Sequence, residues 1–82
     1  MSARVTLYSK PGCHLCADVR ALLDEIQHSY QFMIDEIDIT SDDELFTRYR
    51  YEIPVLLIDG DEVGRGLLAE RDVLKAFEGR PR

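Results

Sequence analysis

Hydrophobic and polar residues alternate in blocks that predict a short strand followed by a long helix. Val5–Ser9 mixes β-branched, apolar and aromatic residues, and Pro11-Gly12 follows it, so we expect a strand that ends at a turn. After this turn the apolar residues recur at steps of one and three positions, which places them along one face of an α-helix. The residues of this face are Leu15, Cys16, Val19, Leu22, Leu23 and Ile26.

The middle of the chain predicts a second strand and a second helix. Residues 31–39 form an apolar segment whose hydrophobic positions change parity halfway along. This change indicates either a strand buried on both faces or a strand with a bulge. Ser41 and Glu44 have the spacing of a capping box, so a helix is expected to begin at residues 40–41. The two acidic residues between them suit the positive end of the helix dipole.

The last third of the chain predicts a hairpin and a third helix. Pro54–Ile58 is a continuous apolar run, and Asp59-Gly60 is a strong turn signal that leads into residues 62–64. Two antiparallel strands are therefore expected here. A final helix is expected from Ala69 to Glu78, with Gly79 as its stop signal.

The predicted elements follow the order strand, helix, strand, helix, strand, strand, helix. The opening strand–helix–strand unit makes the first two strands parallel, whereas the hairpin makes the last two antiparallel. A mixed four-stranded sheet with helices on its faces buries all of these apolar faces, which is an α/β architecture. The length of 82 residues suits one domain, so we expect a single domain over residues 1–82 with a disordered tail at 80–82.

The charge balance limits the partners of the protein. Ten basic and sixteen acidic residues leave a formal charge of −6 and a pI near 4.7. This balance argues against nucleic acid and against a polybasic membrane contact. The sequence opens without a signal-peptide pattern, and its longest apolar run, Val55–Ile58, is too short to span a membrane. We therefore expect a cytoplasmic protein, in which structural disulfides are rare.

The two cysteines, Cys13 and Cys16, lie where the first strand gives way to the first helix. A Cys-x-x-Cys beside a strand–helix–strand pattern is typical of a thioredoxin-like redox site. A cysteine at a helix start faces unpaired N–H groups and the positive end of the helix dipole, which favour the thiolate. Cys16 lies one turn later on the apolar face, so we expect it to be the buried partner that resolves a mixed disulfide on Cys13.

Other uses of the cysteine pair stay open on the sequence alone. A structural disulfide fits the spacing but not the expected compartment. A closed zinc site needs four ligands, which this pair does not supply, so no metal site is expected. An iron–sulfur cluster would need ligands from a second chain or from glutathione. A non-catalytic peptide-binding or redox-sensing module is the remaining alternative.

Two segments of the sequence carry a specific combination of motifs: Thr6-Leu7-Tyr8-Ser9-Lys10-Pro11-Gly12-Cys13-His14-Leu15-Cys16 and, far downstream, Ile53-Pro54-Val55-Leu56. Together they resemble the glutaredoxins of the thioredoxin-fold group, in particular small glutaredoxin-like proteins with a Cys-His-Leu-Cys-type site. The resemblance covers nearly the whole chain. It implies a thioredoxin-like, glutaredoxin-type three-layer fold with the order β-α-β-α-β-β-α.

The same resemblance implies roles for residues around the cysteine pair. Cys13 becomes the nucleophile and Cys16 the resolving thiol. Pro54 becomes a cis-proline that faces the dithiol, and the backbone of Ile53 offers strand-like hydrogen bonds to a disulfide substrate. Lys10 supplies a cation that stabilises the thiolate and attracts a substrate carboxylate.

The region after the hairpin departs from the glutaredoxin pattern. Gly66 matches the glycine turn before the last helix, but glutaredoxins commonly have a second glycine and an Asp there to hold the amino end of glutathione. Arg65 is the residue left to meet a glutathione carboxylate. We therefore expect glutathione to be a weak co-substrate, with a thioredoxin-reductase-type system as the other candidate donor.

The sequence thus predicts a monomeric thiol–disulfide oxidoreductase. Its expected substrates are protein or small-molecule disulfides, and no tightly bound cofactor is expected. The reaction would use the dithiol of Cys13 and Cys16, with contacts from Lys10, Ile53 and Pro54.

Overall fold

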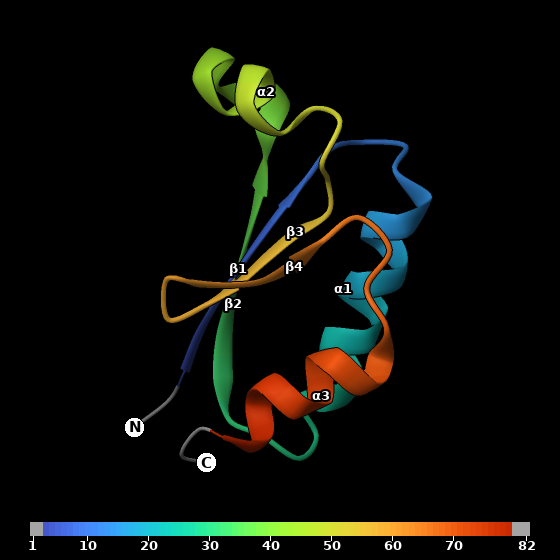
Figure 1. Cartoon of the computed structure of the whole chain (residues 1–82), viewed down its shortest axis with the longest axis vertical. Coiled ribbons are helices and arrows are strands. Elements are labelled where there is room, and N and C mark those ends of the chain that lie inside the picture. Colours follow the sequence, from blue (N-terminus) through green and yellow to red (C-terminus); the bar gives the residue numbers. More distant parts are fainter. Residues whose placement is uncertain (1–2, 80–82) are drawn as a thin grey trace.

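The computed structural model of the protein describes residues 3–79 and contains a four-stranded sheet with the order β2-β1-β3-β4 (Figure 1). Its elements follow the order predicted from the hydrophobic pattern, with one short 3₁₀ turn, η1, added before the second helix. The elements are β1 (Ala3–Ser9), α1 (His14–Ile26), β2 (Phe32–Asp38), η1 (Ile39–Ser41), α2 (Asp43–Tyr49), β3 (Val55–Ile58), β4 (Asp61–Arg65) and α3 (Glu70–Glu78).

The strand pairing confirms the predicted mixed sheet. β1 lies parallel to β2, antiparallel to β3, and β3 forms a hairpin with β4. The bulge considered for the second strand is wrong, because the β1–β2 register is unbroken, and the irregularity lies instead between Leu56 and Leu57. The parity change in β2 reflects partial burial on both faces, since Ile34 and Ile37 are each half-buried on this edge strand.

The main core lies between the sheet and the pair α1 and α3, which cover the same side of the sheet in Figure 1. Alternation along β1 turns Val5 and Leu7 into this core, where both are fully buried. Phe77 of α3 packs its ring against Phe32 of β2, with ring centroids 4.7 Å apart. Leu23 of α1 belongs to the same core cluster and is also fully buried.

The opposite face of the sheet carries α2, which gives the predicted third layer. Tyr8 has the other parity from Val5 and Leu7, and its ring stacks on Tyr49 of α2 with centroids 4.8 Å apart. No residue of α2 is fully buried, so this layer is thin.

The predicted N-cap of the second helix is wrong by one residue. Asp42, not Ser41, is the N-cap of α2, and its carboxylate accepts hydrogen bonds from the N–H groups of Glu44 and Leu45. Ser41 belongs to η1, and its hydroxyl donates to the carbonyl of Asp38. Because this bond engages the Ser41 hydroxyl, the Asp42 carboxylate is left to cap α2.

The sequence also predicts a disordered C-terminal tail and no membrane-spanning segment. The predicted tail at 80–82 lies outside the described residues. Within residues 3–79 no helix has both the length and the apolar character needed to cross a membrane.

Candidate functional site

The cysteine pair sits at the first turn of α1, where the helix begins. Cys13 is the N-cap with extended backbone angles (φ −90°, ψ 108°), and its Sγ accepts a hydrogen bond from the N–H of Cys16 at 3.2 Å. The two residues are joined by a disulfide, with Cα atoms 5.2 Å apart. A sulfur atom in this position takes the place of a capping oxygen and faces the N–H groups that would stabilise a thiolate.

The two sulfurs differ in their access to solvent. Cys16 is only 3% exposed, whereas Cys13 is half-buried at the edge of the helix. This difference confirms the expected unequal exposure of the pair. An attacking thiol must be reached by its substrate, so Cys13 is the better placed of the two for this step.

A cavity of about 330 Å³ opens beside the disulfide and contains charges of both signs. Exposed Lys10, predicted from the sequence, lines it together with Glu36, which sequence reasoning missed. Glu36 accepts a hydrogen bond from the buried hydroxyl of Ser9 at 3.0 Å and pairs with Arg20 at 3.2 Å. The full lining is Lys10, Gly12, Cys13, His14, Cys16, Ala17 and Glu36.

Glu36 reaches the cavity because of strand pairing. It lies on β2 opposite Leu7 of β1 and shares the parity of Phe32 and Ile34, which face α1. From the sequence, the alternation along residues 31–39 could have indicated that Glu36 shares a face with Phe32 and Ile34. Only the β1–β2 register shows that this part of the strand lies beside the start of α1.

The proline after α2 has the predicted conformation. The Ile53–Pro54 bond is cis, Pro54 is buried, and Ile53 is half-buried. Val55 pairs with Tyr8, so Pro54 lies at the end of the sheet where β1 leads into the cysteine loop. A direct contact between Pro54 and Cys13 stays a prediction.

Gly66 fixes the segment that contains this proline. Its N–H donates to the carbonyls of Glu52, at 3.1 Å, and of Pro54, at 2.8 Å. Its φ of 72° lies in the left-handed region, which glycine adopts without the steric cost of a side chain. The predicted glycine turn before the last helix is therefore present, and it ties β4 to the cis-proline segment.

Arg65 is already paired with carboxylates of its own chain. Its guanidinium donates two hydrogen bonds to Glu62, and one nitrogen lies 3.8 Å from a carboxylate oxygen of Glu52. The hydrogen bonds with Glu62 raise the pKa of Arg65 and lower the pKa of Glu62 from its ordinary value. The guanidinium also lies 5.8 Å from the centre of the Tyr49 ring. The side chain offered by the sequence as a carboxylate ligand thus has its charge neutralised locally.

The predicted site residues form two groups at the same end of the sheet. Cys13, Cys16 and Lys10 line one cavity, and the segment with Ile53 and Pro54 is hydrogen-bonded to the turn after β4. Within residues 3–79 no cluster of three or more histidine, cysteine or acidic side chains could hold a metal ion. The arrangement therefore provides a dithiol, a cation and an open backbone segment.

These features define a class: a glutaredoxin-like thioredoxin fold with a cysteine pair at the start of its first helix. The model of the Glutaredoxin-like domain family (DUF836) matches residues 4–78, and the chain belongs to this family. The comparison with curated proteins found no match.

Solved structures share the fold along most of their length. A protein of Nitrosomonas europaea, solved by NMR, is 26% identical, with a TM-score of 0.77 over 94% of this chain and 92% of that chain. A protein of X. campestris is 24% identical, with a TM-score of 0.74 over 94% of this chain and 99% of that chain. A mutant thioredoxin from Halobacterium salinarum is 18% identical, with a TM-score of 0.71 over 95% of this chain and 74% of that chain.

The geometry of the helix start predicts unequal reactivity of the two thiols in the reduced protein. Thiols at helix starts have pKa values of about 3.5–7.5, against about 8.5 for a free cysteine, so Cys13 should react faster at low pH. Single-cysteine variants, titrated with iodoacetamide, measure each rate as a function of pH. Faster alkylation of Cys16 than of Cys13 at pH 6 would reverse the assigned roles.

Proposed function

We propose that the protein is a dithiol thiol–disulfide oxidoreductase, with Cys13 as nucleophile and Cys16 as resolving thiol. One observation carries the proposal: Cys13 caps α1 with its sulfur, and Cys16 is buried one turn further on and within bonding reach. Membership of the glutaredoxin-like family supports a redox role for this pair.

The proposed reaction consists of two exchange steps. The thiolate of Cys13 attacks a substrate disulfide, which breaks; a mixed disulfide forms, and one substrate thiolate leaves and takes up a proton. Cys16 then loses its proton and attacks Sγ of Cys13, so the second substrate thiol is released. The substrate disulfide gains two electrons, and the protein is left with the Cys13–Cys16 disulfide seen in the structure.

The backbone around the cis-proline is the proposed substrate platform. Ile53 is half-buried, and its backbone would offer strand-like hydrogen bonds to residues beside the substrate disulfide. Lys10 lies on the cavity beside Cys13, where its cation favours the thiolate. These groups would hold the substrate disulfide in line with Sγ of Cys13 for the attack.

The electron donor that returns the protein to its dithiol state is the second part of the proposal. Glutathione carries two carboxylates, and a site that binds it must supply matching cations or N–H groups. Lys10 is exposed beside Cys13, but Arg65 is engaged by Glu62 and Glu52. We therefore propose that glutathione is a weak donor and that a thioredoxin-reductase-type system reduces the protein more efficiently.

The donor proposal predicts a high Michaelis constant for glutathione. One lost charged hydrogen bond corresponds to about a ten- to hundredfold weaker binding, so this constant should exceed that of a standard dithiol glutaredoxin by this factor. Turnover of the oxidised protein is measured with glutathione and, in parallel, with a thioredoxin reductase system.

A variant tests the stated cause. Glu62→Gln removes the partner that holds Arg65, so it should lower the Michaelis constant for glutathione and leave the reductase-driven rate unchanged. Efficient, saturable turnover of the unmodified protein at low glutathione would contradict the donor proposal.

A further inference from the structure

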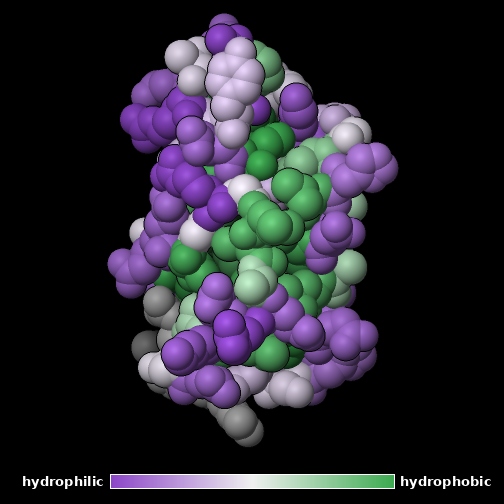
Figure 2. All heavy atoms as spheres, turned by 45° about the vertical axis from the view of Figure 1, so that its right-hand side comes forward, coloured by the Kyte–Doolittle hydropathy of each residue, from purple (hydrophilic) through white to green (hydrophobic). Residues whose placement is uncertain are grey.

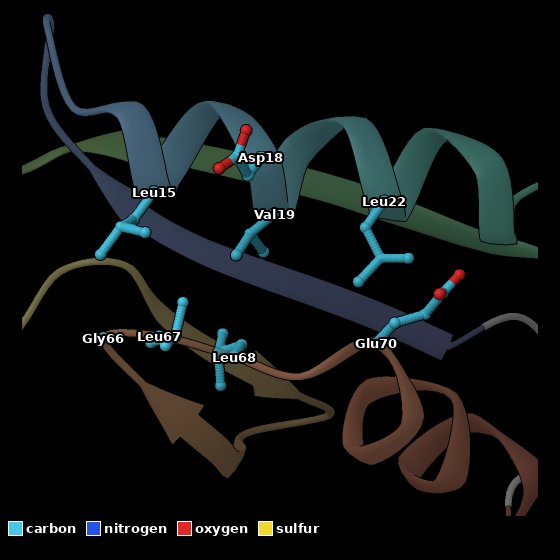
Figure 3. Close-up of a pocket in the computed structure, with 8 residues that line it drawn as sticks. All are labelled: Leu15, Asp18, Val19, Leu22, Gly66, Leu67, Leu68 and Glu70. Atoms are coloured by element: carbon cyan, nitrogen blue, oxygen red, sulfur yellow. The ribbon is translucent and has the colours of Figure 1, made fainter.

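An apolar groove starts at Leu15 and runs between α1 and the segment that joins β4 to α3. Its first part is a cavity of about 310 Å³, in which leucines from α1 face leucines from that segment (Figure 3). The lining residues are Leu15, Asp18, Val19, Leu22, Gly66, Leu67, Leu68 and Glu70.

The groove continues between α1 and α3. A second cavity of about 220 Å³ shares Leu22 and Glu70 with the first and adds Leu74 and Ile26. From Leu15 to Ile26 the helix rises by about 16 Å, which matches about five residues of an extended peptide. Figure 2 shows the groove region as a hydrophobic area between hydrophilic borders.

All charged side chains that line this groove are acidic. Asp18 and Glu70 border the first cavity, and Glu25 joins Glu70 at the second. Within the described residues none of the three forms an ion pair, and no lysine or arginine lines either cavity. The groove therefore combines an apolar floor with a purely negative border.

In the described part of the chain, the groove and the cavity beside the disulfide share no lining residue, but Leu15 and Gly66 connect the groove to the proposed site. Leu15 lies between Cys13 and Cys16 and is 38% exposed, and Leu67 follows Gly66, whose N–H holds the cis-proline segment. Leu67 is 83% exposed, so a large apolar side chain projects beside the site without a covering partner in the described chain. Leu15 therefore forms the end of the groove that is nearest to the cysteine pair.

We propose that this groove binds a segment rich in both apolar and basic residues, located next to the disulfide of a protein substrate. The proposal rests on the proposed function and adds its substrate class. Apolar side chains of the segment cover the leucines, and its lysines or arginines meet the acidic border. Acidic substrates, including the anionic glutathione disulfide, meet like charges there.

The test uses peptides that each carry one cysteine as a mixed disulfide with 2-nitro-5-thiobenzoate, whose release is followed by absorbance. One peptide has the segment Leu-Lys-Leu-Lys-Leu beside the cysteine, a second replaces Lys with Glu, and a third replaces Leu with Ser. Each peptide is made in two versions, one with the segment on the N-terminal side of the cysteine and one with it on the C-terminal side. The protein is reduced beforehand and freed of reductant. We expect its second-order rate constant with the first peptide to exceed that with the second by about tenfold at low salt, and by less at high salt.

Matched variants separate the groove from the overall acidic charge. Asp18→Asn combined with Glu70→Gln should reduce the preference for Lys over Glu to about twofold or less. Asp43→Asn combined with Glu44→Gln removes the same charge at α2, on the other face of the sheet, and should leave the preference unchanged. Leu67→Ser should lower the rate with the leucine peptide, whereas Met33→Ser, at another exposed site on β2 (62% exposed), should not.

Two further measurements distinguish failure of this proposal from failure of the proposed function. Bis(2-hydroxyethyl) disulfide is too small to reach the groove, so its reduction reports the dithiol chemistry alone. If the protein reduces this small disulfide but shows no preference among the peptides, the groove proposal is overturned and the proposed function stays intact. Absence of reduction of every disulfide would overturn the proposed function.

If the protein reduces no disulfide, a peptide-binding experiment still tests the groove proposal. The Leu-Lys-Leu-Lys-Leu peptide with serine in place of its cysteine is added to ¹⁵N-labelled protein, and amide shifts are recorded. Shifts localised at Val19, Leu22 and Leu67, and lost in the Asp18→Asn, Glu70→Gln variant, support the groove. Absence of localised shifts overturns it.

Discussion

Replacement of Cys13 by serine is expected to reduce disulfide turnover to the uncatalysed rate. The nucleophile in thiol–disulfide exchange is a thiolate, and a serine hydroxyl at the start of α1 cannot replace it at neutral pH. The buried Cys16, 3% exposed, is too enclosed to take over the first attack. Turnover is measured with bis(2-hydroxyethyl) disulfide and a reductase-coupled assay.

Cys16→Ser is the matched variant, and it should behave differently. Cys13 still attacks, but nothing resolves the mixed disulfide, so the variant should accumulate a covalent adduct with its substrate that mass spectrometry detects. Adducts trapped in this way from cells would identify physiological partners. Full turnover of Cys13→Ser, or failure of Cys16→Ser to form any adduct, would contradict the assigned roles. A pair that neither turns over nor forms adducts would favour the non-catalytic binding module.

Replacement of Phe77 by alanine is expected to cause the largest loss of stability. Phe77 is 1% exposed, and its ring packs against Phe32 and Tyr30, with centroids 4.7 and 5.7 Å away. Truncation of a buried phenylalanine costs about 3–5 kcal/mol of unfolding free energy, because it removes apolar contacts and leaves a cavity. Small domains are stable by only about 5–15 kcal/mol, so this loss is severe.

Urea denaturation of the two proteins in the same redox state measures the difference. Glu78→Ala, the next residue and exposed, is the control and should change the unfolding free energy by less than about 0.5 kcal/mol. A loss below about 1 kcal/mol for Phe77→Ala would show that α3 contributes little to the core.

Local sequence patterns were sufficient for the elements and for the reactive pair. The periodicity from Leu15 to Ile26 predicts α1 because an apolar face must repeat every three or four residues to stay on one side of a helix. The Asp59-Gly60 turn predicts the hairpin, and both residues have the positive φ that such a turn requires. The cis bond before Pro54 was also predicted, with support from the resemblance to glutaredoxins.

Competition between nearby groups limited prediction at one boundary. Ser41 and Asp42 are both good N-caps, and sequence spacing favoured the first. In the structure the turn at Asp38 engages the Ser41 hydroxyl, which leaves Asp42 to cap α2. Both side chains compete for backbone partners within a few residues, so the outcome depends on the local backbone path.

By itself the sequence determined the order of the elements, the position of Cys13 at a helix start and the burial of Cys16, because each depends on residues within one or two turns. Only the tertiary structure placed Glu36 beside the cysteines, paired Arg65 with Glu52, and aligned Asp18 with Glu70 along one groove. These residues are distant in sequence or lie on different elements. Strand register and helix packing bring them together, and neither is encoded in the spacing of any single segment.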